Sequence, residues 1–220
     1  MNRSPSLAVR LTLCMSLAAT ACVSTGCEAI SHLSYLRHGF HPIRAKFGGL
    51  EGKRVAVVCL DANSLSGPAA EADAVAKAVA LDLAYHVPDI EVVRHSEIAD
   101  WMDNQEQDLT DYRDVGRGVK ADMVVGIDLA SFSIHEGQTL LKGRANAGVK
   151  VFDMTRGGDV VFESPAKEIC WPENGARHVT ENESNFRAIF LHNLAQKIAH
   201  DFYTYELIED YSLDAAHLAN

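Results

Sequence analysis

The sequence predicts one α/β domain: a three-layer, five-stranded mixed sheet with helices on both faces. Three observations support this prediction. Residues 55–60 form a continuous apolar run that is too short for a helix, as expected of a central strand covered on both faces. A helical stretch and a second strand follow, which is the order of a right-handed parallel crossover. Residues 140–152 alternate between small or branched and polar side chains, the period of a strand with one exposed face.

The first helix is expected over residues 68–85. Proline is favoured in the first turn of a helix, and the alanines that follow have high helix propensity. Val75, Val79 and Leu83 repeat every four residues, so this face is expected to pack on the sheet. A second strand is expected at residues 90–94.

Two short helices and a long strand are expected in the middle of the chain. Residues 96–105 predict the first helix, for which Ser96 is a candidate N-cap. An amphipathic segment at residues 111–119 predicts the second. Residues 123–134 are rich in branched side chains, which favours the third strand.

The last part of the chain predicts a meander and a closing helix. Residues 140–152 and 160–169 flank a glycine-bearing turn, so strands three to five are expected to be antiparallel. Thr180, with Glu183 three residues later, is a capping-box signal. The expected order is therefore β-α-β-α-α-β-β-β-α. Apolar residues recur at helical spacing in the closing helix: Phe186, Ile189, Phe190, Leu194, Ile198 and Phe202.

The chain begins with the features of a bacterial export signal. Arg3 and Arg10 precede an apolar run at residues 11–23, and small residues then lead to Cys27. The apolar run is short for a membrane span. The stretch Thr25-Gly26-Cys27 resembles the lipobox of bacterial lipoproteins, in which the cysteine thiol is lipidated and the chain is cut just before it.

The lipobox resemblance implies that Cys27 carries the lipid, with Cys22 as the rival acceptor. An ordinary cleaved signal and a membrane-anchored N-terminus are the alternatives. The chain is therefore expected to contain a lipoprotein signal peptide at residues 1–26, a lipidated tether at 27–53, a single α/β domain at 54–209 and a C-terminal tail at 210–220.

The charge of the processed chain excludes one class of partner. Cleavage before Cys27 leaves 18 basic against 30 acidic side chains, a formal charge of -12. Nucleic-acid binding needs a clustered basic surface, so no nucleic-acid partner is expected. The same charge argues against binding of anionic lipid headgroups by the folded part, so the membrane is expected to be contacted through the lipid anchor.

Four local sequences resemble an α/β domain that several envelope proteins share: residues 53–58, 92–98, 119–126 and 149–153. The domain occurs in the curli-export lipoprotein (CsgG-like), in the N-terminal part of the TolB periplasmic protein and in lipoprotein activators of penicillin-binding proteins. The resemblance implies an envelope protein that faces the periplasm or the exterior and works by contact rather than by catalysis. The chain has no internal repeat, so the propeller of TolB is not expected.

Polar residues follow the first two expected strands. Asp61 and Asn63 come after the first strand and His95 after the second. Ligand clefts of open α/β sheets lie beyond the carboxyl ends of parallel strands, so these residues are candidate ligand-binding residues. The alternative is structural, with Asp61 and Asn63 as turn formers and His95 as a residue before a helix cap.

Two cysteines remain in the processed chain, Cys59 and Cys170, and an export compartment would allow a disulfide between them. The alternative is that Cys59 is a small buried hydrophobe within its apolar strand. No metal site or cofactor is expected, because the histidines near residue 38 lack a carboxylate or cysteine at ligand spacing.

Two classes of function agree with these observations. The first is a non-catalytic, lipid-anchored envelope protein that binds another envelope protein or assembles a complex. The second is an anchored enzyme or small-ligand binder that uses the cleft near Asp61 and His95. An exposed apolar patch would favour the first, and a deep pocket with convergent polar groups would favour the second.

Overall fold

The computed structural model describes residues 42–61, 70–105, 111–178 and 182–206 of the 220-residue chain. All of them belong to the unit Pro42–Asn220. The signal peptide, the acceptor cysteines 22 and 27, Asn63, Pro68 and the expected tail at 210–220 lie outside the described residues.

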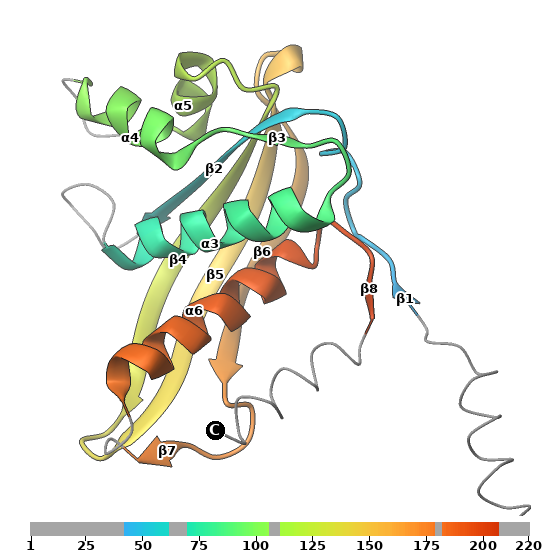
Figure 1. Ribbon diagram of the computed structural model, residues 1–220. Coiled ribbons are helices and arrows are strands. Elements are labelled where there is room, and N and C mark those ends of the chain that lie inside the picture. The colour runs from blue at the N-terminus through green and yellow to red at the C-terminus, as the bar shows by residue number, and fades with distance from the viewer. Residues whose placement is uncertain (1–41, 62–69, 106–110, 179–181, 207–220) are drawn as a thin grey trace, which may run out of the picture. The chain divides into compact units, whose positions relative to one another are not determined.

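The elements follow the expected order (Figure 1). The strands are β1 (Pro42–Ile43), β2 (Arg54–Asp61), β3 (Glu91–Val92), β4 (Met123–Glu136), β5 (Leu140–Asp153), β6 (Asp159–Trp171), β7 (Arg177–His178) and β8 (Tyr205–Glu206). The helices are α3 (Ala70–His86), α4 (His95–Asp103), α5 (Tyr112–Gly118) and α6 (Glu183–Ala199), with a 3-10 turn η1 at Met154–Arg156.

The mixed sheet confirms the predicted fold class. Five strands lie in the order β3-β2-β4-β5-β6, and the two-residue β7 pairs with β5. β2 is parallel to both β3 and β4, which confirms the parallel crossover through α3. β4, β5 and β6 pair antiparallel, which confirms the meander.

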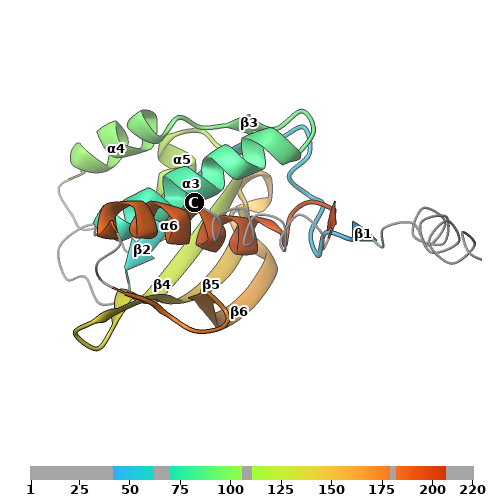
Figure 2. The same ribbon diagram turned by 60° about the horizontal axis from the view of Figure 1, so that its bottom comes forward.

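Helices cover both faces of the sheet, so the three-layer prediction is also confirmed (Figure 2). Alternate residues of β2 face opposite layers because successive strand side chains point to opposite sides. Val57 lies in the larger core, with apolar side chains of α3 and α6. Val58 lies in the smaller core, with Ile98 of α4 and Val115 of α5.

The folded domain begins earlier than Arg54, so the predicted boundary between tether and domain is wrong. Leu50 is fully buried in the larger core, and the ring of Phe47 packs 5.4 Å from that of Phe162. β1 pairs antiparallel with β8, which joins the start of the described chain to its end. The glycines of this segment favour loose structure, but burial of its apolar side chains outweighs that tendency.

Two glycines of the sheet allow helices to approach closely. A Cβ at Gly143 of β5 would lie 2.4 Å from the ring of Phe190 of α6. A Cβ at Gly126 of β4 would lie 2.8 Å from the ring of Tyr112 of α5. Each aromatic ring therefore fills the space that a side chain would need.

The helix caps differ from the predicted ones. The N-cap of α6 is Asn182, whose Oδ1 accepts from the backbone N–H groups of Ser184 and Asn185. Thr180, at which the capping box was predicted, lies outside the described residues, and the described helix is capped by Asn182 instead. The helix α4 starts one residue before Ser96, and its N-cap is Arg94, which makes no side-chain cap bond.

Candidate functional site

Of the predicted cleft residues, Asp61 and His95 are described by the structure, and they lie on two different elements. Asp61 ends β2, and His95 begins α4. Nε2 of His95 pairs with the carboxylate of Asp73, in the first turn of α3. Burial alone would raise the pKa of Asp73, but the hydrogen bond from Lys77 and the nearby imidazole hold it below its usual value. His95 is thus the first residue of α4 and forms an ion pair with a carboxylate of α3.

The parallel strands β2 and β3 do not end at the same level. β3 is only two residues long, and its last residue, Val92, pairs with Val55 near the start of β2. Asp61 lies six residues further along β2, a distance of roughly 20 Å at the usual strand rise. The cleft near Asp61 and His95 therefore stays a prediction.

The candidate disulfide is not formed, because Cys59 and Cys170 are both free. Cys59 lies on β2 and Cys170 on β6, with β4 and β5 between the two strands. Three strand spacings amount to roughly 14 Å, far beyond the reach of a disulfide. Burial raises the pKa of the Cys59 thiol to about 12, so Cys59 is an unreactive core residue.

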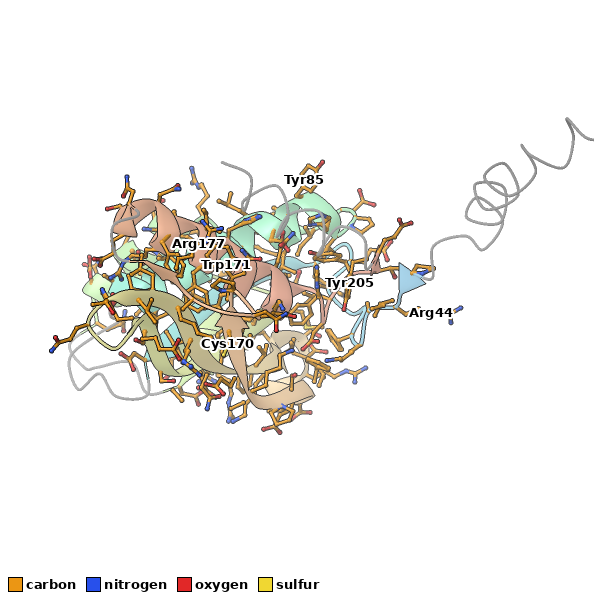
Figure 3. The ribbon with its side chains drawn as sticks, turned by 90° about the horizontal axis from the view of Figure 1, so that it is seen from below. Arg44, Tyr85, Cys170, Trp171, Arg177 and Tyr205 are labelled. Carbon is orange, nitrogen blue, oxygen red and sulfur yellow. The ribbon has the colours of Figure 1, made fainter. Side chains whose placement is uncertain are left out.

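A pocket of about 440 Å³ lies at the opposite edge of the sheet from β3. It is formed where the end of β6, the end of α6 and the β1–β8 pair meet, and Figure 3 marks Cys170 and Tyr205 on two of these elements. The volume lies within the range of small-ligand sites. Its lining residues are Ile43, Arg44, Lys46, Lys167, Glu168, Ile169, Cys170, Glu173, Lys197, His200, Asp201 and Tyr205.

Asp201 is the most buried charged residue of the pocket lining. Its side chain is 4% exposed, and Oδ1 lies 2.7 Å from Nζ of Lys46. Oδ2 is buried and has no hydrogen-bond donor among the described residues. A buried acceptor without a donor is costly, so this oxygen is an unsatisfied hydrogen-bond acceptor within the described ranges.

Both signs of charge gather around the pocket. Lys197 Nζ lies 2.5 Å from Glu173 Oε1, and Glu168 pairs with Arg144 outside the pocket at 3.7 Å. Arg44 and Lys167 are exposed and form no ion pair within the described ranges. In Figure 3, the side chain of Arg44 lies beside β1 and extends away from the domain. The rim therefore offers two cationic groups that are not committed to a carboxylate.

Stacked rings form one side of the pocket. The imidazole of His200 stacks on the ring of Tyr205 with centroids 3.6 Å apart, and its edge meets Tyr203 at 5.5 Å. Tyr203 stacks in turn on His86 of α3 and donates a 2.8 Å hydrogen bond to Asp82. These stacked rings connect the end of α6 to α3 and therefore hold that side of the pocket in place.

The outer face of α3 is apolar although it faces solvent. Leu81 is 73% exposed and Tyr85 is 85% exposed, and Tyr85 points away from the domain in Figure 3. The two side chains are neighbours because residues four apart lie on the same side of a helix. Lys77 is the charged residue of this face and is paired with Asp73. We call Leu81, Tyr85 and the exposed Ala84 next to Tyr85 the α3 outer face.

Neither the pocket nor the α3 outer face is predicted by a sequence motif. Leu81 and Tyr85 lie on the side of α3 opposite to Val75, Val79 and Leu83. Apolar residues on both sides of the predicted helix were the sequence signal that could have indicated this surface. Asp201 has no sequence signal, because its partners come from β1 and the residues after it. Across the described ranges, no cluster of histidine, cysteine and carboxylate residues could hold a metal ion. No helix in those ranges has the length and apolarity needed to cross a membrane.

Comparison with known proteins identifies no family. No family model matches the chain, and no curated protein sequence matches it. Among solved structures, the PelC dodecamer from Paraburkholderia phytofirmans is 11% identical and has a TM-score of 0.43, with 74% of this chain and 96% of that chain covered. Lipoprotein GNA1162 from Neisseria meningitidis is 12% identical and has a TM-score of 0.42, with coverage of 66% and 97%.

A third similar structure is the LpoB C-terminal domain from Salmonella enterica, with 14% identity, a TM-score of 0.37 and coverage of 56% and 85%. The similar structures thus include bacterial lipoproteins. All three TM-scores lie below 0.5, so no function is transferred from these proteins.

Proposed function

We propose that this chain is a lipid-anchored protein of the bacterial cell envelope whose domain binds another protein and is not an enzyme. The observation that carries the binding role is the α3 outer face. A solvent-facing helix side usually carries charged and polar residues, whereas this one exposes Leu81, Tyr85 and Ala84. Large exposed apolar side chains in a cluster are typical of protein-binding surfaces.

The α3 outer face has the composition of the central part of a protein–protein interface. Tyr85 offers a large ring with a hydroxyl at its tip, and aromatic residues are enriched where binding energy concentrates. The small side chain of the exposed Ala84 lets a partner approach the helix backbone closely. The charged residues beside the face already have partners: Lys77 pairs with Asp73, and Asp82 contacts Tyr203 and His86. A protein that docks on the face therefore does not bury an unpaired charge.

Site-specific photo-crosslinking in native envelopes tests the binding role. A photoreactive residue at Leu81 or Tyr85 is expected to give one discrete adduct. The same residue at Arg117, an exposed position on α5 in the opposite layer, is the matched control and is expected to give none. Equal labelling at all three positions, or none at any, would contradict the proposed surface.

The anchor is proposed from the sequence, on Thr25-Gly26-Cys27 and the apolar run before it. Several acyl chains hold a protein on a membrane where a single chain is marginal. Intact mass of the natively expressed chain is expected to show loss of residues 1–26 and addition of lipid at Cys27. Cys27→Ala is expected to release the protein from the membrane fraction, with Cys22→Ala as the control that leaves it bound. Release by Cys22→Ala instead would assign the lipid to the rival cysteine.

A further inference from the structure

We propose that the α3 outer face binds a cationic amphipathic segment of another protein. The apolar side chains of this segment would cover Leu81, and an arginine or lysine beside them would lie over the ring of Tyr85, towards Asp89. The inference rests on the proposed binding role of this face and adds the chemistry of the partner. Three features of the C-terminal end of α3 favour a positive charge there.

The first feature is the ring of Tyr85. It is 85% exposed and points away from the domain in Figure 3, so a partner can reach it. The faces of an aromatic ring carry partial negative charge, which attracts a guanidinium or ammonium group placed over them. Leu81, four residues earlier and 73% exposed, provides apolar surface beside the ring. A segment that pairs an apolar side chain with a cation therefore matches both residues.

The second feature is the end of the helix itself. α3 ends at His86, so Tyr85 lies in its last turn. The carbonyl groups of the last turn of a helix carry partial negative charge, which favours cations near them. His86 is the basic residue of this turn, whereas Lys77 lies nine residues before the helix end and pairs with Asp73. The last turn thus contains no lysine or arginine of its own, and a partner can supply one.

The third feature is an exposed carboxylate just beyond the helix. Asp89 lies in the turn after α3, four residues from Tyr85, so their Cα atoms are at most about 14 Å apart. Three turns of a bound helix cover that span. Asp89 forms no ion pair within the described ranges. A partner cation near Tyr85 therefore adds a charge pair and breaks none at Asp89.

The charge of the chain argues against a second copy as the occupant. The formal charge is -10 at pH 7, and a symmetric dimer through α3 would bring the same acidic helix end from both copies to one interface. Like charges that face each other across an interface are unfavourable. A cationic partner is instead attracted to this surface during encounter and held there after docking.

Two designed helical peptides test this chemistry on the purified full-length chain. Both carry the same pair of leucines four residues apart, flanked by arginines in one peptide and by glutamates in the other. Fluorescence anisotropy at low salt is expected to show about tenfold tighter binding of the arginine peptide, because a cation–π contact and an ion pair are gained together. Added salt is expected to reduce the difference. Equal binding of the two peptides, or binding of neither, would overturn the proposal.

Substitutions at exposed positions locate the preference for arginine. Asp89→Asn removes the charge, and asparagine tolerates the positive φ of 53° at this position. Tyr85→Leu keeps an apolar contact but removes the ring. Each is expected to reduce the preference about threefold, whereas Glu163→Gln, the same charge change on the strand at one edge of the sheet, leaves it unchanged. An unchanged preference in both Asp89→Asn and Tyr85→Leu would overturn the proposal.

Photo-crosslinking from Leu81 in native envelopes separates this inference from the proposed binding role. The yield of the adduct is expected to fall about threefold in the Asp89→Asn background and to stay the same in the Glu163→Gln background. Full yield in the Asp89→Asn background would overturn the cationic partner and leave the binding role intact. An adduct with the mass of two chains would identify a second copy and also overturn it. Absence of any adduct in the unsubstituted background would count against the binding role itself.

Discussion

Lys46 and Asp201 form an ion pair of 2.7 Å that connects the first part of the described domain to the residues after its last helix. The backbone carbonyl of Asp201 also accepts from the N–H groups of Lys46 and Phe47, both at 2.9 Å. The carboxylate is buried, whereas the Lys46 side chain is 59% exposed. The pair therefore neutralises a buried charge with a cation that reaches in from solvent.

Lys46→Ala is expected to lower the free energy of unfolding by about 2 kcal/mol, because the Asp201 carboxylate stays buried without its cation. Adding Asp201→Asn is expected to restore part of that loss. Arg117→Ala breaks an exposed pair with Asp114 and is expected to cost less than about 0.5 kcal/mol. Urea denaturation of these variants measures the difference, and equal effects of the two single variants would contradict it.

Leu50→Ala is expected to lower the free energy of unfolding by about 2–5 kcal/mol, because Leu50 is fully buried in the larger core. Glu51→Ala changes the neighbouring exposed residue and serves as the control. Thermal or urea denaturation makes the comparison. A loss below about 0.5 kcal/mol for Leu50→Ala would mean that the segment before Arg54 is a tether after all.

Gly143→Ala is expected to destabilise the domain by about 1–3 kcal/mol, because the new methyl group would overlap the ring of Phe190. Gly137→Ala is not a suitable control, since its positive φ adds strain of its own. The matched test is Phe190→Leu, which opens space above the strand. The Gly143→Ala substitution is expected to cost less in the Phe190→Leu background than in the wild type, and an equal cost would refute the contact.

Iodoacetamide at pH 8 is expected to modify Cys170 in the folded protein and to spare Cys59. The pKa of the Cys59 thiol is raised to about 12 by burial, so its thiolate is scarce at this pH. Both thiols are expected to react after unfolding in urea without any reductant, since they are free. Peptide mass analysis reads both sites, and a requirement for reductant would show a disulfide.

Stability is expected to depend on Asp153 at acid pH. The hydroxyl of Thr155 donates a 2.6 Å hydrogen bond to the Asp153 carboxylate and holds its pKa below the usual value. A lowered folded pKa stabilises the fold fully above the unfolded pKa of about 4, and this contribution is lost as the pH falls through the lower folded pKa. Asp153→Asn is therefore expected to cost about 1 kcal/mol at pH 7 and less near pH 2.5. A pH-independent cost in urea denaturation would contradict this.

Local patterns predicted most of the fold. The apolar run of β2, the alternation of β5 and the four-residue repeat of α3 each identify an element by its period, and the structure confirms all three. The end of the predicted tether was missed because glycines around Leu50 hide any period. Leu50 is buried in a core cluster that also contains apolar side chains of α6, more than one hundred residues away in the sequence.

For the candidate sites too, local patterns indicate residue types, whereas contacts between distant segments decide which residues meet. The residue types at Asp61 and His95 suggested a cleft, but strand length and register decide which side chains meet, and β3 is only two residues long. The pocket beside Asp201 is assembled from β1, β6, α6 and β8, whose contacts no local pattern encodes. The residues of the α3 outer face are neighbours on one helix, so the sequence shows that they lie together. Their exposure depends on how the helix packs in the fold.

The sequence by itself determined the order of helices and strands, the acidic charge and the export features, because periodicity, composition and short motifs are properties of neighbouring residues. The tertiary structure decided where the domain begins, that Cys59 and Cys170 stay apart, and that Asp201 and Lys46 meet. The physical reason is that burial and pairing between distant segments depend on the three-dimensional arrangement of the chain, in which one strand register or one buried leucine outweighs local preference.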